Sequence, residues 1–351
     1  MARIITITSG KGGVGKTSIS LNLSLALAAE GFKVCLFDAD LGLANVNILT
    51  GLYPQKDLES VISGRAALTD ILIRDYQGID IIPGSSGVER LADLTRAETG
   101  TLISAFLNLD AYDFFIFDTS AGISSQVLAF CMASHEIILV VTTEPTSLTD
   151  AYSMLKVMSK HGYDRPVKVI VNQVAEGKAA QKAYARLKQT VTRFLPARIE
   201  PLGIVASDKN VRASVIAQTP FFLLFPDTVA SRCMTAIAEK LIKHHGKAGD
   251  IPLELFWDNC LYFLEKHSPR KSRKPRDNKT GRTDPDLGER LSQMEEKLSF
   301  LVNEMGHIRE LLETRVPTAA RVEEGPCPEP HNIILDFESW LLVSGCTLRQ
   351  P

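Results

Sequence analysis

Glycines and lysines near the amino terminus form the first group of residues whose spacing could do chemistry. Residues 10–17 have the sequence GKGGVGKT, which matches the pattern G-x-x-x-x-G-K-[ST]. In this pattern the glycines let backbone N–H groups turn towards phosphate oxygens, the lysine reaches the β- and γ-phosphates, and the hydroxyl binds Mg²⁺. The pattern needs Lys16 and Thr17 but leaves a second lysine, Lys11, without a role. The nucleotide contacts expected from this stretch are Gly10, Gly12, Gly13, Val14, Gly15, Lys16, Thr17 and Ser18.

Three aspartates lie where predicted strands end, and they are the candidates for metal binding and catalysis. Asp38 and Asp40 follow one apolar run, and Asp118 follows another. Mg²⁺ prefers oxygen ligands, and the carboxyl ends of parallel strands meet at one edge of a sheet. We therefore expect the metal shell to contain Thr17, Asp38 and Asp118, with Asp118 as the second-strand carboxylate of a P-loop NTPase. Asp38 and Asp40 are two residues apart, and either could orient the attacking water.

Short apolar, β-branched runs alternate with helical patterns along most of the chain. The predicted strands are residues 4–8, 34–37, 79–82, 114–117, 137–141, 167–171 and 199–205. Helices are expected over residues 17–30, 148–160 and 230–245, where apolar residues recur at three- and four-residue spacing. This alternation predicts an α/β fold, with a mostly parallel twisted sheet, helices on both of its faces and a C-terminal helical extension.

The composition limits the classes of function. The 351 residues are 45% hydrophobic with a net charge of -2, so binding to nucleic acid or lipid would need a local basic patch. Six scattered cysteines without a C-x-x-C pair argue against a zinc site or a disulfide framework and fit a reducing cytoplasm. Because no window holds eighteen uninterrupted apolar residues, we expect a cytoplasmic protein that does not span a membrane.

The alternating pattern stops near residue 246, so we expect a nucleotide-binding domain over residues 1–246. Residues 251–265 form an amphipathic stretch that fits either a membrane surface or docking on the domain. A basic linker over 266–284 and a coiled-coil-like helix over 285–315 with heptad spacing follow, and 316–351 are unassigned. The residues of the amphipathic stripe that would contact a membrane are Leu253, Phe256, Trp257, Leu261 and Leu264.

Several segments together resemble the MinD/ParA class of deviant P-loop ATPases. The segments that carry the resemblance are KGGVGKT, DADLGLANVNILTGL (38–52), DTSAGIS (118–124) and VNQV (171–174). Within that class, PGSSGVERLADL (83–94) and TTEPTSLTDAYSMLK (142–156) look most like the flagellar number regulators called FlhG or FleN. The resemblance covers about residues 2–245.

The resemblance implies a homodimer that forms on ATP binding, with two ATP molecules and their Mg²⁺ ions between the subunits. It assigns catalytic roles to Lys11, Lys16 and Asp40. In this family Lys11 crosses to the partner's phosphates, in the manner of an arginine finger supplied in trans, and Asp40 positions the attacking water. Further implied nucleotide contacts are Asn45, Asn172 and Asp208.

The function implied is an ATP-driven switch on the inner face of the cell membrane that regulates flagellar number or placement, or the organisation of the cell pole or division site. The amphipathic stretch and the basic run after it would contact anionic lipid. The flagellar GTPase FlhF or another ATPase-activating protein is the expected partner. The alternative is a ParA-type partition ATPase that binds nonspecific DNA, which is the weaker expectation because the sequence of the ATPase region shows no obvious basic cluster.

Overall fold

Eight strands form one sheet in the order β3-β4-β2-β5-β1-β6-β7-β8. The computed structural model describes residues 2–40, 45–52, 56–84, 94–109, 112–243 and 252–267. Neighbouring strands are parallel except for β3 and β4, which pair antiparallel at one edge. The strands are β1 (Arg3–Ser9), β2 (Val34–Ala39), β3 (Ile73–Tyr76), β4 (Ile79–Ile82), β5 (Phe114–Ala121), β6 (Glu136–Val141), β7 (Val167–Val174) and β8 (Ile199–Ala206).

The burial of the strands is typical of a parallel sheet. Every residue of β1, β2 and β6 is buried, which happens only when helices cover both faces of a sheet. The expected mostly parallel sheet is confirmed. Strand β3 was not predicted, because its sequence IRDY is short, charged and partly exposed, as is common for an edge strand.

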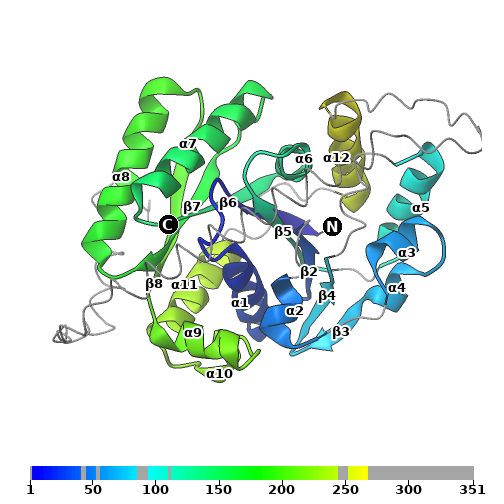
Figure 1. Cartoon of the computed structure of the whole chain (residues 1–351), viewed down its shortest axis with the longest axis horizontal. Helices are drawn as coiled ribbons and strands as arrows, with labels where there is room; N and C mark the ends of the chain where they lie inside the picture. The colour runs from blue at the N-terminus through cyan, green and yellow to red at the C-terminus, as the bar shows by residue number, and fades with distance from the viewer. Residues whose placement is uncertain are drawn as a thin grey trace, which may run out of the picture. The chain divides into compact units, whose positions relative to one another are not determined.

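Helices cover the two faces of the sheet (Figure 1). One half of the core joins the sheet to α1, α10 and α11, and the other half joins it to α5, α6, α7, α8 and α12. The helices are α1 (Lys16–Ala29), α2 (Asn45–Thr50), α3 (Leu58–Ile62), α4 (Leu68–Ile71), α5 (Arg96–Leu107), α6 (Ser125–Ala133), α7 (Pro145–Lys160), α8 (Gly177–Phe194), α9 (Lys209–Ile216), α10 (Phe221–Leu224), α11 (Val229–Lys243) and α12 (Leu253–His267).

Helix α12 packs on α5 and α6 (Figure 1). The ring of Trp257 lies 4.5 Å from that of Phe106 on α5, and the ring of Phe256 lies 4.4 Å from that of Phe117 on β5. The apolar face of α12 is thus docked on the domain, which is the arrangement that the sequence left open beside membrane binding. The five side chains assigned to a membrane lie against the core, with Phe256, Trp257 and Leu264 buried and Leu253 and Leu261 partly buried.

The docked face of α12 limits how this helix could contact a membrane. In this structure the stripe of α12 is not available to lipid, and contact with a membrane through it requires α12 to leave α5 and α6. Within the described parts of the chain, no helix is both long and apolar enough to span a membrane. The predicted linker (266–284) lies outside the described residues from 268 onwards, and the coiled-coil-like helix (285–315) and the tail (316–351) lie wholly outside them.

Candidate functional site

The glycine-rich loop connects β1 to α1, at the place where the sequence pattern predicts a phosphate site. Gly13 and Gly15 have φ angles of 76° and 88°, a left-handed conformation that residues with a Cβ rarely adopt. Gly10 packs on the main chain of α7, so a side chain there would overlap the backbone of Asp150. The glycines are therefore required by the loop's own shape, before any ligand is considered.

The end of β7 holds the loop from the side. The amide Nδ2 of Asn172 donates to the carbonyl of Val14 at 2.8 Å, and Nε2 of Gln173 donates to the carbonyl of Gly13 at 3.2 Å. A Cβ on Gly15 would lie 2.5 Å from Asn172 Nδ2, so the two residues fit closely. Asn172, which the resemblance assigns to the nucleotide, thus positions the phosphate loop in this structure. Sequence reasoning missed Gln173, although it belongs to the same VNQV segment.

Two aspartates meet at the carboxyl edge of the sheet, as expected. Asp38 and Asp118 are in register on β2 and β5, and both are fully buried. Backbone N–H groups of Asp40 and Val46 donate to the Asp38 carboxylate at 3.1 and 3.3 Å. Ser20 Oγ donates to Asp118 Oδ1 at 2.9 Å, whereas Asp118 Oδ2 is buried without a hydrogen-bond partner among the described residues.

Burial and like charge dominate the electrostatics of this edge. Burial raises the pKa of Asp38, and the neighbouring charge of Asp118 raises it further. Burial also raises the pKa of Asp118, against the lowering effects of Thr17, Lys16 and Ser20. The pKa of Lys16 is lowered by burial, which the charges of Asp118 and Asp40 oppose. Lys16 and the three carboxylates therefore share one small region.

The donor set of this region fits Mg²⁺. Hydroxyl and carboxylate oxygens are its preferred ligands, and the unpaired Oδ2 of Asp118 is an acceptor that a cation or its water shell would satisfy. Among the described residues, no group of three or more His, Cys, Asp or Glu side chains could hold a metal ion. The ion would thus take its remaining ligands from phosphate and water, as Mg²⁺ usually does.

Lys11 is held within its own subunit in this structure. Its Nζ lies 2.5 Å from Glu144 Oε2 and donates to Thr146 Oγ1 at 3.0 Å. Both partners lie at the start of α7, with Pro145 at the first helical position, where a proline is well tolerated. Sequence reasoning identified neither Glu144 nor Thr146. The expected contact of Lys11 with a second subunit stays a prediction.

The remaining predicted residues lie at the edges of this region. Asp208 caps α9 by accepting a hydrogen bond from the N–H of Asn210 at 2.8 Å, and its implied contact with the nucleotide stays a prediction. Asn45 begins α2, and its side chain lies outside the described part of the structure. Ser18 follows Thr17 in the first turn of α1, and its carbonyl accepts from Asn22 Nδ2 at 2.7 Å.

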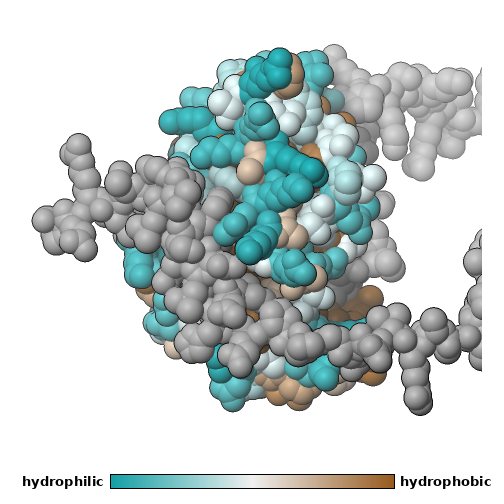
Figure 2. Space-filling model, turned by 90° about the vertical axis from the view of Figure 1, so that its left-hand side faces the viewer, coloured by the Kyte–Doolittle hydropathy of each residue, from teal (hydrophilic) through white to brown (hydrophobic). Residues whose placement is uncertain are grey.

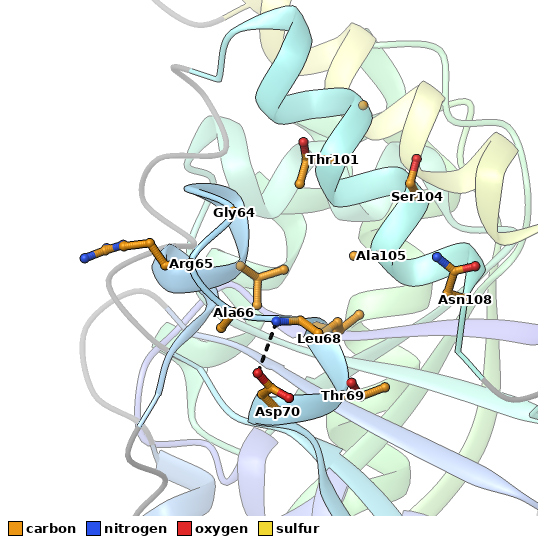
Figure 3. A pocket seen from close by; sticks show the side chains of 13 residues that line it. Gly64, Arg65, Ala66, Leu68, Thr69, Asp70, Thr101, Ser104, Ala105 and Asn108 are labelled. Atoms are coloured by element: carbon orange, nitrogen blue, oxygen red, sulfur yellow. Dashed lines mark hydrogen bonds between the residues drawn. The ribbon is translucent and has the colours of Figure 1, made fainter.

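An open cavity of about 810 Å³ lies between α5 and the α3–α4 segment (Figure 3). Its walls are mostly small or hydroxyl-bearing residues, and none of the predicted site residues lines it. The Asp70 carboxylate at its edge is already bound by Lys56 at 3.0 Å and by the N–H of Ala67 at 3.3 Å. We assign no chemistry to this cavity.

The chain is similar to known proteins in sequence and in structure. Residues 5–221 match the family model of the CobQ/CobB/MinD/ParA nucleotide binding domain. The chain is 40% identical over 241 residues to the antiactivator FleN of Pseudomonas aeruginosa, covering 68% of this chain and 86% of FleN. It is 34% identical over 271 residues to the flagellum site-determining protein YlxH of Helicobacter pylori, covering 75% of this chain and 90% of YlxH.

A solved structure supports the same assignment. The septum site-determining protein MinD of Pyrococcus horikoshii, complexed with Mg-ADP, superposes with a TM-score of 0.57 at 27% identity. The superposition covers 72% of this chain and 100% of that one. Residues 5–221, which the family model matches, contain the glycine-rich loop, both buried aspartates and the end of β7. The chain is a P-loop ATPase that belongs to the CobQ/CobB/MinD/ParA nucleotide-binding family.

Proposed function

We propose that the protein is an ATP-dependent dimerising switch that regulates flagellar number or placement. The observation that carries this proposal is Lys11, which lies in the phosphate loop beside the exposed Gly12 and Gly13, with 37% of its side chain exposed. A lysine at this position can reach a second subunit without unfolding any element of its own. The similarity to FleN and YlxH supports the flagellar role.

In this proposal ATP binds with Mg²⁺ at the loop between β1 and α1. Lys16 contacts the β- and γ-phosphates, while Thr17 and Asp118 hold the Mg²⁺, which neutralises charge that builds up on the phosphates. Asp40 positions the attacking water. Lys11 of the second subunit then places a cation beside the transferring phosphoryl group, where it stabilises the transition state. Hydrolysis therefore depends on dimerisation.

Association with an anionic membrane belongs to the same proposal. The aromatic stripe of α12 is suited to an interface once it leaves the domain, and the basic run after residue 265 would add attraction of about 1 kcal/mol per cation near the lipid surface. Because the stripe is docked in the free subunit, we expect little lipid binding without ATP. An ATPase-activating partner such as FlhF would act on the lipid-bound dimer.

The experiment that tests the dimer model follows ATPase rate and oligomeric state against protein concentration. Wild-type protein should gain specific activity as concentration rises, because each site needs a second subunit. Lys11→Ala should lose this gain, and Asp40→Ala should accumulate as an ATP-bound dimer with little turnover. Lys33→Ala, which removes an exposed lysine immediately before β2, is the matched control and should behave as wild type. A Lys11→Ala protein that dimerises and hydrolyses ATP like wild type would refute the model.

The structure also favours a second candidate, a partition-type ATPase that binds nonspecific DNA. Helix α8 contains no acidic residue, and its cations are all exposed on a surface that Figure 2 shows as mostly hydrophilic. The four-residue spacing of three of them places these three on one face of a single helix. The cations of α8 are Lys178, Lys182, Arg186, Lys188 and Arg193.

Binding of nonspecific duplex DNA in the presence of ATP separates the two candidates. If DNA is the ligand, affinity should fall steeply with salt, and Lys182→Ala with Arg186→Ala should reduce the slope by about 0.9 for each lost phosphate contact. ATP-dependent binding to anionic vesicles, with DNA affinity unchanged by the two substitutions, would favour the flagellar switch.

A further inference from the structure

The ammonium group of Lys11 is engaged by two side chains of its own subunit. It forms an ion pair with Glu144 at 2.5 Å and a hydrogen bond to Thr146 at 3.0 Å. The hydrogen bond from Lys11 is the largest effect on Glu144, and it lowers the pKa of that carboxyl. The main chain of Lys11 is held as well, since Ser9 Oγ donates to the carbonyl of Lys11 at 2.7 Å.

We propose that Glu144, assisted by Thr146, is a positioning residue that holds Lys11 in cis in the monomer and must release it before dimerisation. This inference rests on the proposed function, in which Lys11 reaches the nucleotide of a second copy of the chain. Glu144 thereby sets the protein concentration at which the ATP dimer forms.

Charge repulsion explains why Glu144 must release Lys11. A phosphate oxygen that accepts a hydrogen bond from Lys11 lies about 2.8 Å from Nζ. If Glu144 kept its place 2.5 Å from the same nitrogen, its carboxylate would lie within about 5 Å of the partner's phosphates. Like charges at that separation repel each other. Because the triphosphate carries several negative charges, this repulsion outweighs what an exposed ion pair contributes, so the pair separates in the dimer and each subunit loses one ion pair on association.

The exposure of the pair limits the size of the effect. The side chains of Lys11 and Glu144 are 37% and 61% exposed, and an ion pair of this kind changes an equilibrium by at most about fivefold. Two pairs break in each dimer. Removing both should thus lower the dissociation constant of the dimer by up to about 25-fold.

The test measures dimerisation by sedimentation with Mg²⁺ and a non-hydrolysable ATP analogue. Glu144→Gln keeps the shape of the side chain and removes its charge, so its dimer should form at a concentration up to about 25-fold lower than wild type. The ATPase rate per dimer at saturating protein should stay unchanged. The matched control is Asp150→Asn, which removes one negative charge from the same helix, and it should dimerise within about twofold of wild type.

Salt gives a readout that a purely structural role for Glu144 would not move. High salt screens the exposed pair, so the difference between wild type and Glu144→Gln should shrink towards zero at about 0.5 M salt. Thr146→Val, which removes only the hydrogen bond, should shift dimerisation in the same direction by a smaller factor. It also serves as the test if Glu144→Gln fails to fold.

Two results would overturn the proposal. One is that Glu144→Gln and Thr146→Val dimerise at the wild-type concentration, and the other is that Asp150→Asn shifts dimerisation as much as Glu144→Gln. Failure of the proposed function looks different. In that case wild type does not dimerise with the analogue at any concentration, or Lys11→Ala dimerises as wild type does. The contact of Lys11 with Glu144 would then have no dimer contact with which to compete.

Discussion

Replacing Trp257 by alanine should loosen α12 from the domain more than any change on the exposed face of that helix. The indole is fully buried and lies 4.5 to 6.2 Å, between ring centroids, from four phenylalanines of β2, α5, β5 and α6. Truncation to alanine removes all of these contacts at once. The phenylalanines are Phe37, Phe106, Phe117 and Phe130.

The magnitude follows from the buried area. A tryptophan buries roughly 150–250 Å², which at about 25 cal/mol per Å² corresponds to roughly 4–6 kcal/mol. The indole N–H of Trp257 is buried without an acceptor among the described residues, an unfavourable contribution of about 1–3 kcal/mol. We therefore expect Trp257→Ala to destabilise the docked state by about 3 kcal/mol. Trp257→Phe keeps an aromatic ring and removes the unpaired donor, so it should cost less than about 1 kcal/mol.

Chemical unfolding and limited proteolysis with chymotrypsin measure this effect. Trp257→Ala should lower the free energy of unfolding and make α12 cleavable at concentrations of protease that leave wild type intact. Tyr262→Ala is the matched control, since Tyr262 lies on the same helix with 65% of its surface exposed, and its effect should stay below about 0.5 kcal/mol. Equal effects of the two alanine variants on stability and cleavage would show that Trp257 does not dock α12.

Three further predictions concern the phosphate site and the far end of α7. Gly84→Ala should destabilise the protein by about 1–3 kcal/mol in thermal unfolding, because its Cβ would lie 2.8 Å from Asp38 Cγ. Asn172→Ala removes the hydrogen bond to Val14 and should weaken nucleotide affinity by about tenfold in a fluorescent-nucleotide titration. Burial, and then the cationic residues at the end of α12, lower the pKa of His161, so the folded protein favours the neutral ring. Its contribution to stability is present above the unfolded value of about 6.5 and is lost as pH falls through the lowered pKa. Unfolding curves from pH 5 to 8 should show this loss in wild type, and less of it in His161→Gln.

The sequence was sufficient wherever the physical constraint is local. The left-handed glycines Gly13 and Gly15 and the adjacent Lys16 lie within one short loop, so their spacing alone predicts its shape. The meeting of Asp38 and Asp118 followed from a general property of parallel sheets rather than from contacts between distant residues.

Contacts between distant residues were not predictable in the same way. Lys11 and Glu144 are 133 positions apart, and nothing in either segment indicates the other. Gln173, whose side chain donates to Gly13 in the loop, has a positive φ of 56°. Glutamine seldom adopts this backbone conformation, and the sequence does not indicate it. Gln173, and Glu144 in our proposal, act by positioning other parts of the site. Such roles depend on which residues the fold brings together.

The stripe of α12 could not be assigned from sequence for an energetic reason. Lipid and protein interiors both remove apolar side chains from water. Burial in either environment therefore contributes a similar free energy per unit of buried area. The deciding factor is whether the domain offers a complementary aromatic surface, and that surface is assembled from β2, α5, β5 and α6, which are far apart in the sequence. Moving α12 from the domain to a membrane would therefore exchange one apolar environment for another. The free energy of docking α12 on the domain and that of inserting it into a membrane would nearly cancel. A few kcal/mol from nucleotide binding and dimerisation would then be enough to decide between the docked and the membrane-bound helix.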